Sequence, residues 1–214
     1  MVTATRLCLV RHGETDWNAE RRLQGHLDIP LNAVGERQAR ATAASLAAER
    51  FAAVYTSDLL RARQTAAAIC AAGHPPPLAD ARLRERHYGL FQGLTYAEAE
   101  ARHPQAYARF HAREPDFAFP GSGESLSAFA ARIDAVLADL AHRHAGGQLL
   151  IVCHGGVLDI VHRLATGKAL QPPRDFVIPN AALNWIVHDG QGWRLQAWAE
   201  QRHLDGARDE LANA

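Results

Sequence analysis

Two apolar segments, far apart in the chain, each end in a histidine followed by glycine. The first is LCLV at residues 7–10, followed by RHG, and the second is LLIVC at residues 149–153, followed by HGG. Short apolar runs of this kind predict buried strands, and amphipathic helices between them predict a parallel sheet. Because parallel strands end at the same edge of a sheet, we expect His12 and His154 to lie close together at that edge.

The rest of the chain continues this alternation of strands and helices. Strands are expected at 6–10, 53–56 and 148–154, and the runs ALNWIVHD (182–189) and WRLQAWAE (193–200) are expected to form a hairpin or adjacent strands. Helices are expected at 32–49, 59–72, 95–98, 104–113, 126–146 and 156–164. The three prolines at 75–77 end the second helix, and the middle region with the helices at 95–98 and 104–113 carries no clear strand. The fold class is therefore α/β, a three-layer α/β/α sandwich with a mostly parallel central sheet. We expect one domain over 1–214, with a helical insertion at about 94–120.

Composition narrows the class of partner. The 23 basic and 23 acidic residues balance, so there is no overall basic field to gather nucleic acid. Cys8, Cys70 and Cys153 are odd in number and widely spaced, which favours a reduced protein in which all three have packing roles. There is no signal-peptide pattern and no apolar stretch of membrane-spanning length. These features predict a cytoplasmic protein that binds neither nucleic acid nor membrane.

Positive groups gather at the sheet edge that carries the two histidines. Arg11 precedes His12, and Arg61 begins the helix after the second strand, so two guanidiniums join two imidazoles. Such a cluster repels itself unless an anion fills it, and guanidiniums donate paired hydrogen bonds that suit phosphate. The HGG segment adds a helix N-terminus, and we expect Gly13 and Gly155 to let phosphate approach the backbone. The edge is a candidate phosphate pocket.

Catalysis at this pocket would need a nucleophile and a proton donor. An imidazole surrounded by positive charge has its protonated form disfavoured, so His12 would keep a free lone pair at neutral pH and could attack phosphorus. A carboxylic acid would then protonate the leaving oxygen. Glu85 is the preferred donor, but spacing alone does not separate it from Glu14 and Glu124. No metal-binding motif is evident.

At this point the sequence resembles the histidine phosphatase superfamily, which includes the cofactor-dependent phosphoglycerate mutases. Five segments stand in the family's order: LVRHGETDWN, TSDLLRARQTA, LRERHYGLFQG, GES at 123–125, and VCHGG. The resemblance implies that His12 becomes a phosphohistidine while Arg11, Arg61 and His154 hold the transferring phosphoryl group. It also implies that Glu85 is the proton donor, that Asn18 and Gln24 line the phosphate pocket, and that no metal cofactor is needed.

The branch of the family is less clear from the sequence. ERHYG followed by QGL resembles the mutases, which makes Arg86 and Tyr88 candidate substrate contacts. HGG in place of HGN, NAA at 180–182 and the short chain resemble the phosphatases. We therefore expect a phosphatase acting on a small phosphorylated metabolite. The alternatives are a mutase primed by 2,3-bisphosphoglycerate and a phospho-ligand binding module without turnover, and a homodimer is left open.

Other distinctive residues are assigned structural roles. Phe91 and Trp185 are expected in the core, and Trp17 in the pocket wall beside the histidine loop. The remaining histidines that we considered have no partner at metal-binding spacing, and each is expected to be structural: His142, His144, His162, His188 and His203.

Overall fold

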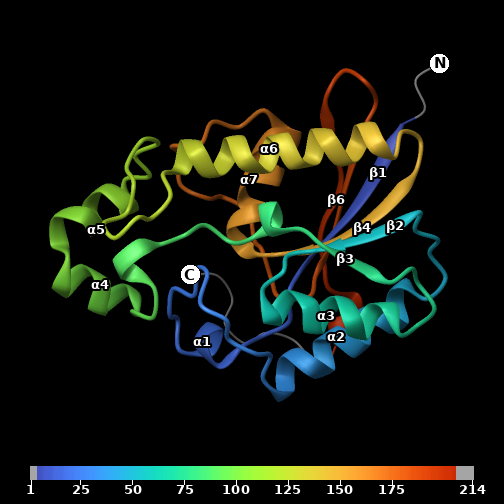
Figure 1. Cartoon of the computed structure of the whole chain (residues 1–214), viewed down its shortest axis with the longest axis horizontal. Coiled ribbons are helices and arrows are strands. Elements are labelled where there is room, and N and C mark those ends of the chain that lie inside the picture. The colour runs from blue at the N-terminus through green and yellow to red at the C-terminus, as the bar shows by residue number, and fades with distance from the viewer. Residues whose placement is uncertain (1–3, 206–214) are drawn as a thin grey trace.

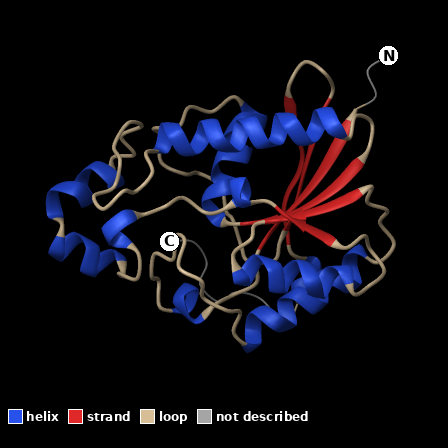
Figure 2. Cartoon of the chain, viewed as in Figure 1, coloured by secondary structure: helices blue, strands red, loops and turns tan. Residues whose placement is uncertain are grey.

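The computed structural model describes residues 4–205, which form a six-stranded sheet with helices on both faces (Figures 1 and 2). The strand order is β3-β2-β4-β1-β5-β6. The strands are β1 (Thr5–Arg11), β2 (Ala53–Thr56), β3 (Pro77–Ala79), β4 (Gln148–Cys153), β5 (Leu183–His188) and β6 (Trp193–Glu200). The first four run parallel, whereas β5 pairs antiparallel with both β1 and β6. The expected α/β sandwich is confirmed, and the last two strands are a hairpin.

Helices cover the two faces of the sheet as separate layers. In Figure 1, α2 and α3 lie below the sheet, and α6 and α7 lie above it. The helices are α1 (Asp16–Ala19), α2 (Ala33–Leu46), α3 (Leu60–Cys70), α4 (Tyr96–Arg102), α5 (Pro104–His111), α6 (Leu126–Arg143) and α7 (Gly155–Thr166). Short 3-10 turns lie at Ala81–Leu83, Gly89–Phe91 and Arg202–Leu204. Each long helix lies within three residues of its expected bounds.

The strand β3 is an element that the sequence did not indicate. Its three residues pair with β2, with Val54 opposite Pro77 and Thr56 opposite Ala79. Pro77 has no N–H to donate, but it begins an edge strand, where a missing donor is tolerated. The prolines at 75–77 therefore both end α3 and introduce a strand, which we did not predict from the sequence.

Alternate residues of β1 enter two separate cores. Leu7 and Leu9 pack against α6 and α7, whereas Cys8 and Val10 pack against α2 and α3. This two-sided burial explains why the strand is a continuous apolar run rather than an alternating one. The three cysteines are free, with Cys8 and Cys153 buried in these cores.

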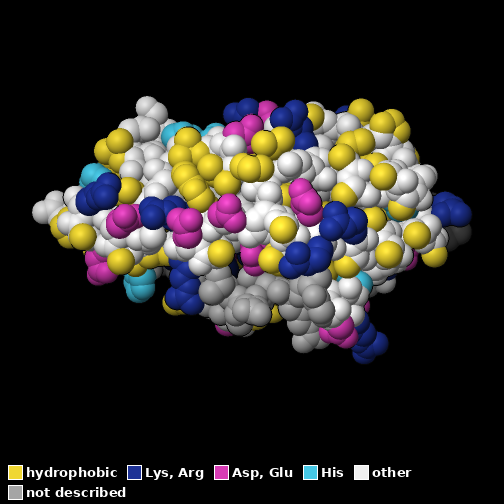
Figure 3. Space-filling view, turned by 90° about the horizontal axis from the view of Figure 1, so that it is seen from below, with side chains coloured by type: hydrophobic (Ala, Val, Ile, Leu, Met, Phe, Trp, Pro, Cys, Tyr) yellow, Lys and Arg dark blue, Asp and Glu magenta, His cyan; other side chains and the backbone are white. Residues whose placement is uncertain are grey.

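The segment that joins the middle of the chain to α6 carries α4 and α5 and packs around a third, aromatic core. Phe91, Phe117 and Phe119 are buried there, and the two helices project beyond the sheet on the left of Figure 1. Both helices lie within the stretch at about 94–120 where we expect a helical insertion. Among residues 4–205, no helix is long and apolar enough to cross a membrane. On the face shown in Figure 3, basic and acidic side chains are interspersed. The termini of the expected 1–214 domain, at 1–3 and 206–214, lie outside the described residues.

Candidate active site

The two histidines lie together where β1 and β4 end. These strands are parallel neighbours, with Arg11 opposite Cys153, so the residue after each strand emerges at the same edge. The rings of His12 and His154 lie 5.2 Å apart between centroids, tilted by 58°. Both rings are buried, with 3% and 0% of the residue exposed. The pairing of two segments more than a hundred residues apart thus builds one site.

One hydrogen bond determines which ring nitrogen of His12 carries the proton. Its Nδ1 lies 2.7 Å from the carbonyl oxygen of Gly13, which can only accept, so Nδ1 carries the proton and Nε2 keeps its lone pair. Burial and the nearby charges of Arg61 and Arg11 lower the pKa of His12 well below its ordinary value. The ring is therefore neutral at pH 7, with a free nitrogen that can act as a nucleophile.

The Arg61 and Arg11 guanidiniums are held in place by backbone carbonyls. Arg61 donates to the carbonyls of Gly25 and Leu27 at 2.8 and 2.9 Å, and Arg11 donates to that of Ile178 at 2.7 Å. Burial lowers the pKa of Arg61 to about 10, so it remains charged at pH 7. Its Nε has no hydrogen-bond partner among the described residues. Both arginines line the same cleft as His12, so an anion bound in this cleft would meet two fixed positive groups.

His154 lies behind His12 and is fully buried, and it is not among the residues that line the cleft. Neither ring nitrogen has a hydrogen-bond partner within the part of the chain that the structure describes. Burial, followed by Arg61 and His12, lowers its pKa well below the ordinary value. A buried polar group without a partner is costly, so His154 has hydrogen-bonding capacity left for a group bound beside His12.

Glu85 is brought to the cleft by the first turn of α7. Its Oε2 accepts from the Gly156 amide at 2.9 Å, and its Oε1 accepts from the Arg86 amide at 2.7 Å. A Cβ on Gly156 would lie 2.1 Å from Oε1, so only glycine leaves room for this carboxylate. The second glycine of HGG therefore makes space for Glu85, while Gly155 lines the cleft beside Arg11.

Gly13 allows the loop after β1 to approach α2 closely. A Cβ at this position would lie 2.5 Å from the carbonyl oxygen of Gly35, near the start of α2. The missing side chain thus lets the loop after β1 pack against α2, and Gly13 is not among the residues that line the cleft. The Gly13 amide donates to Thr65 Oγ1 at 3.0 Å, which fixes the loop further.

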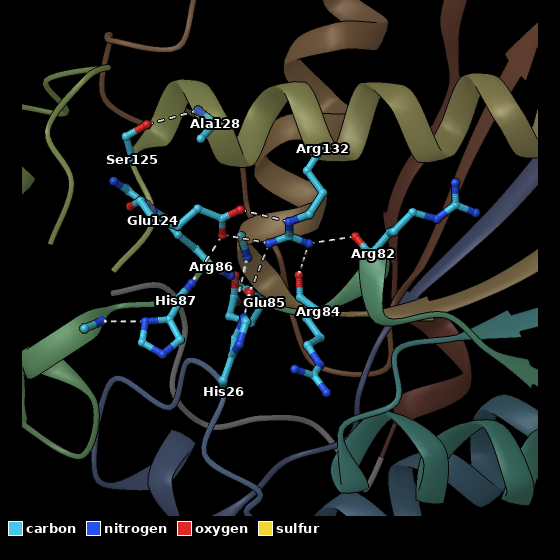
Figure 4. A network of polar contacts seen from close by, with 12 residues as sticks. His26, Arg82, Arg84, Glu85, Arg86, His87, Glu124, Ser125, Ala128 and Arg132 are labelled. Atoms are coloured by element: carbon cyan, nitrogen blue, oxygen red, sulfur yellow. Dashed lines mark hydrogen bonds and ion pairs between the residues drawn. The ribbon is translucent and has the colours of Figure 1, made fainter. Parts of the chain in front are cut away.

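A network centred on Arg132 of α6 holds the segment that carries Glu85 (Figure 4). Arg132 donates to the carbonyls of Arg82 and Arg84 at 2.7 and 3.0 Å. It also forms a two-point ion pair with Glu124, at 2.7 and 2.8 Å. The Glu124 amide in turn donates to the carbonyl of His87 at 2.8 Å. Glu124 therefore supports the Glu85 segment from outside the cleft.

Of the three acids considered as proton donors, only Glu85 lines the cleft among the described residues. Glu14 accepts from Asn32 Nδ2 at 2.8 Å beside the start of α2, and Glu124 is paired with Arg132. The geometry thus separates candidates that spacing in the sequence could not.

The cleft has a volume of about 320 Å³, and Asn18, Gln24 and Tyr88 lie in its wall. Arg86 also lines it, but its guanidinium donates to the carbonyls of Glu124 and Phe117 at 3.0 and 3.2 Å. Part of the hydrogen-bonding capacity of the Arg86 guanidinium is therefore used to hold the insertion in place. Trp17 lines the cleft as expected, while Phe91 and Trp185 are buried in the core, at 0% and 5% exposed.

Asn180 is a site residue that the sequence reasoning did not select. It is fully buried, and its Nδ2 donates to the His12 carbonyl at 2.8 Å, which fixes the backbone of the nucleophile. Its Oδ1 has no partner among residues 4–205. The NAA pattern at 180–182 was the available signal, but we used it only to distinguish branches of the family.

Three of the histidines that were assigned structural roles make contacts outside the cleft. His162 stacks on Phe176 with 3.5 Å between ring centroids, His144 lies 2.9 Å from the Tyr55 hydroxyl, and His203 lies 3.0 Å from the Ala181 carbonyl. Within the described residues, no group of three or more His, Cys, Asp or Glu side chains could hold a metal ion.

Comparison with known proteins identifies the family. The model for the histidine phosphatase superfamily (branch 1) matches residues 7–201. The chain belongs to the histidine phosphatase superfamily. Among curated relatives in Arabidopsis thaliana, it is 41% identical to phosphoglycerate mutase-like protein 4 over 202 residues, covering 93% of this chain and 86% of the relative. It is 39% identical to a metal-independent phosphoserine phosphatase over 207 residues, covering 94% and 83%.

The fold of this histidine phosphatase also matches solved structures. Bacillus stearothermophilus YhfR superposes with a TM-score of 0.84 at 33% identity, covering 94% of this chain and 99% of that one. The chain is thus a phosphoryl-transfer enzyme of the histidine phosphatase and phosphoglycerate mutase type.

Proposed function

We propose that this histidine phosphatase is a metal-independent hydrolase of phosphomonoesters, acting through a phosphohistidine at His12 on a small phosphorylated metabolite. The observation that carries the proposal is the Nδ1 contact of His12 with the Gly13 carbonyl. It leaves Nε2 unprotonated beside two guanidiniums, and Glu85 lies in the wall of the same cleft.

The reaction has two steps. Nε2 of His12 forms a bond to phosphorus while the bond from phosphorus to the ester oxygen breaks, and Glu85 gives its proton to the departing oxygen. A water molecule then attacks the phosphohistidine, and its oxygen forms a bond to phosphorus while the bond from phosphorus to Nε2 breaks. Glu85 takes a proton from that water, and inorganic phosphate leaves. Arg11 and Arg61 stabilise the charge on the phosphoryl oxygens throughout, which is the task that a metal ion performs in other phosphoryl-transfer enzymes.

The similarity to a phosphoserine phosphatase supports hydrolysis. Transfer between two positions of a phosphoglycerate, primed by 2,3-bisphosphoglycerate, is the second candidate, because the ERHYG segment places Arg86 and Tyr88 in the cleft wall. The placement of Glu85 argues against a binding module, since a protein that only holds phosphate has no use for a proton donor in its cleft.

The proposal is tested by incubating the enzyme with p-nitrophenyl phosphate and a panel of phosphomonoesters in the presence of EDTA. We expect phosphate release with EDTA present, and loss of both turnover and acid-labile phosphoenzyme in His12→Ala. A parallel assay offers 3-phosphoglycerate with catalytic 2,3-bisphosphoglycerate. Fast isomerisation with little phosphate release would replace hydrolase by mutase, and no turnover in either assay by a folded protein would refute the enzymatic proposal.

A further inference from the structure

A histidine outside the cleft contacts the backbone of Glu85. The ring of His26 points toward Glu85 (Figure 4), and its Nε2 lies 2.8 Å from the Glu85 carbonyl oxygen. Because a carbonyl can only accept, Nε2 carries the proton and donates it. His26 is half-buried and is not among the residues that line the cleft, whereas Glu85 is. The imidazole therefore holds the proposed proton donor from outside the cleft.

The loop from Gly25 to Leu27, on which His26 lies, also holds Arg61. The carbonyls of Gly25 and Leu27 accept from Arg61 at 2.8 and 2.9 Å. The His26 amide donates to Gln92 Oε1 at 2.8 Å, and a Cβ on Gly25 would lie 2.1 Å from that oxygen. The Gly25–Leu27 loop thus has backbone anchors that do not involve the imidazole.

The backbone of Glu85 depends more strongly on His26. Arg132 of α6 donates to the same carbonyl, but at 3.4 Å, which is a longer and weaker contact. Of the two amides that bind the Glu85 carboxylate, that of Arg86 belongs to the next residue and moves with Glu85, while that of Gly156 belongs to α7. The contact with His26 is therefore a principal restraint on where Glu85 lies.

The surroundings of His26 keep its proton on this contact. The His87 ring packs edge-on against the His26 ring, with 4.8 Å between centroids and 84° between planes. Burial lowers the pKa of His26; the hydrogen bond to Glu85 opposes this fall, and the charges of His87 and Arg84 add to it. The ring is neutral at pH 7, so its single proton is the one that Nε2 donates to the Glu85 carbonyl.

We propose that His26 is a positioning residue, which fixes the backbone of Glu85 to the Gly25–Leu27 loop and so sets where the proton donor lies relative to the phosphoryl group held by Arg61. Because the loop keeps its own anchors, loss of the imidazole N–H should displace Glu85 and leave Arg61 in place. Phosphate binding then persists, while the departure of a leaving oxygen that needs a proton becomes slower. The inference rests on the proposed role of Glu85 in the hydrolase reaction.

Two variants that differ by one methylene group test the proposal. The side-chain amide in His26→Gln can take the place of Nε2 and donate to the Glu85 carbonyl, whereas the amide in His26→Asn is too short to reach it. We expect His26→Asn to lower kcat for β-glycerophosphate, an alkyl phosphate, about tenfold, as the loss of one hydrogen bond would give. The kcat for p-nitrophenyl phosphate should fall by less than about twofold, because its leaving group departs as an anion.

Binding measurements separate the displacement of Glu85 from a general loss of structure. In His26→Asn, the KM values and the inhibition constant of inorganic phosphate should stay unchanged, since Arg61 keeps its two carbonyls. His26→Gln should keep kcat for β-glycerophosphate within about twofold of the unmodified enzyme. The matched control is His144→Asn, which removes a half-buried imidazole 2.9 Å from the Tyr55 hydroxyl, and it should leave the ratio of the two kcat values unchanged.

The tautomer of His26 can be measured on the unmodified enzyme. Nitrogen NMR, with His26→Gln to assign the signal, should show the proton on Nε2. A proton on Nδ1 would overturn the proposal directly, since the ring could not then donate to the Glu85 carbonyl.

The outcomes distinguish this inference from the proposed function. Equal losses of kcat on both substrates in His26→Asn, or a loss in His26→Gln as large as in His26→Asn, would refute the role of His26 while the hydrolase function stands. If His26→Asn proves unfolded by thermal melting, His26→Phe, which fills the space of the ring without a donor, replaces it in the same assays. No hydrolysis of any phosphomonoester by the unmodified enzyme would refute the proposed function and this inference with it.

Discussion

At the scale of single residues, the site depends on hydrogen bonds that fix protons and lone pairs. The Gly13 carbonyl sets the tautomer of His12, and the Gly156 and Arg86 amides hold the two oxygens of Glu85. The backbone of Gly13, Gly156 and Arg86 makes each of these contacts, so a substitution at these residues leaves the contacts in place unless the added side-chain atoms collide with a neighbour. Gly156 and Gly13 are such positions, because a Cβ on Gly156 would lie 2.1 Å from Glu85 Oε1 and a Cβ on Gly13 would lie 2.5 Å from the Gly35 carbonyl oxygen.

The proton-donor role of Glu85 makes a prediction about leaving groups. Glu85→Gln should slow turnover of alkyl phosphates by about a hundredfold, the lower range for general acid catalysis, because their leaving oxygens need a proton. Turnover of p-nitrophenyl phosphate, whose leaving group departs as an anion, should fall by less than about tenfold. Steady-state kinetics with both substrates provide the measurement. Glu36→Gln, an exposed residue of α2, is the control, and equal losses on both substrates would contradict the acid role.

At the scale of elements, α6 positions the segment that carries Glu85 from outside the cleft. Arg132 connects α6 to that segment by donating to two of its carbonyls while pairing with Glu124 (Figure 4). The helix thereby contributes to the site without touching a ligand, and Arg132 is a positioning residue.

We expect Arg132→Met to lower the free energy of unfolding by about 2 kcal/mol, because a half-buried ion pair and two backbone carbonyls lose their partner. It should also lower kcat for alkyl phosphates more than for p-nitrophenyl phosphate, with little change in KM, since Glu85 becomes less well placed. Arg143→Met, on the same helix and paired with Asp139, is the matched control. Destabilisation with equal kinetic losses on both substrates would reduce Arg132 to a purely structural role.

The elements that could be read from the sequence are those with a strong local signal. The strands before His12 and His154 are apolar on both faces because each enters two cores, and this produces a pattern that stands out. The strand β3 has three residues and depends on pairing with β2, so its own sequence carries little information. The roles of Arg132 and Asn180 could not be predicted for a similar reason, because their contacts join positions that only the folded chain brings together.

At the scale of the whole molecule, the layers bury a cluster of ionisable groups around the end of the sheet. Burial together with Arg61 and Arg11 lowers the pKa of both His12 and His154 well below the ordinary value. In the unfolded chain these histidines would titrate near pH 6.5. The folded state therefore disfavours protonation of both His12 and His154.

Stability should consequently depend on pH in a defined direction. Below about pH 6.5 the unfolded chain binds more protons than the folded chain. The stability that comes from keeping these two histidines neutral is therefore complete above that pH and is lost as the pH falls. Each histidine can remove up to about 1.4 kcal/mol per pH unit. Urea unfolding from pH 8 to pH 5 should show a smaller decline in His154→Gln than in the unmodified protein, whereas His142→Gln, exposed on α6, should follow the unmodified protein. An unchanged decline in His154→Gln would show that His154 is not held neutral.

The place of β1 in the middle of the sheet bears on how the protein is made. Arg6 pairs with Gln148 on one side and with Val187 on the other, so both partners of the first strand are synthesised late. At ribosomal rates of roughly 5–20 residues per second, the LCLV segment remains without a paired strand on either edge for on the order of 10 s. That interval makes residues 7–10 the segment where we expect a chaperone to bind the nascent chain, or aggregation to begin when none is at hand.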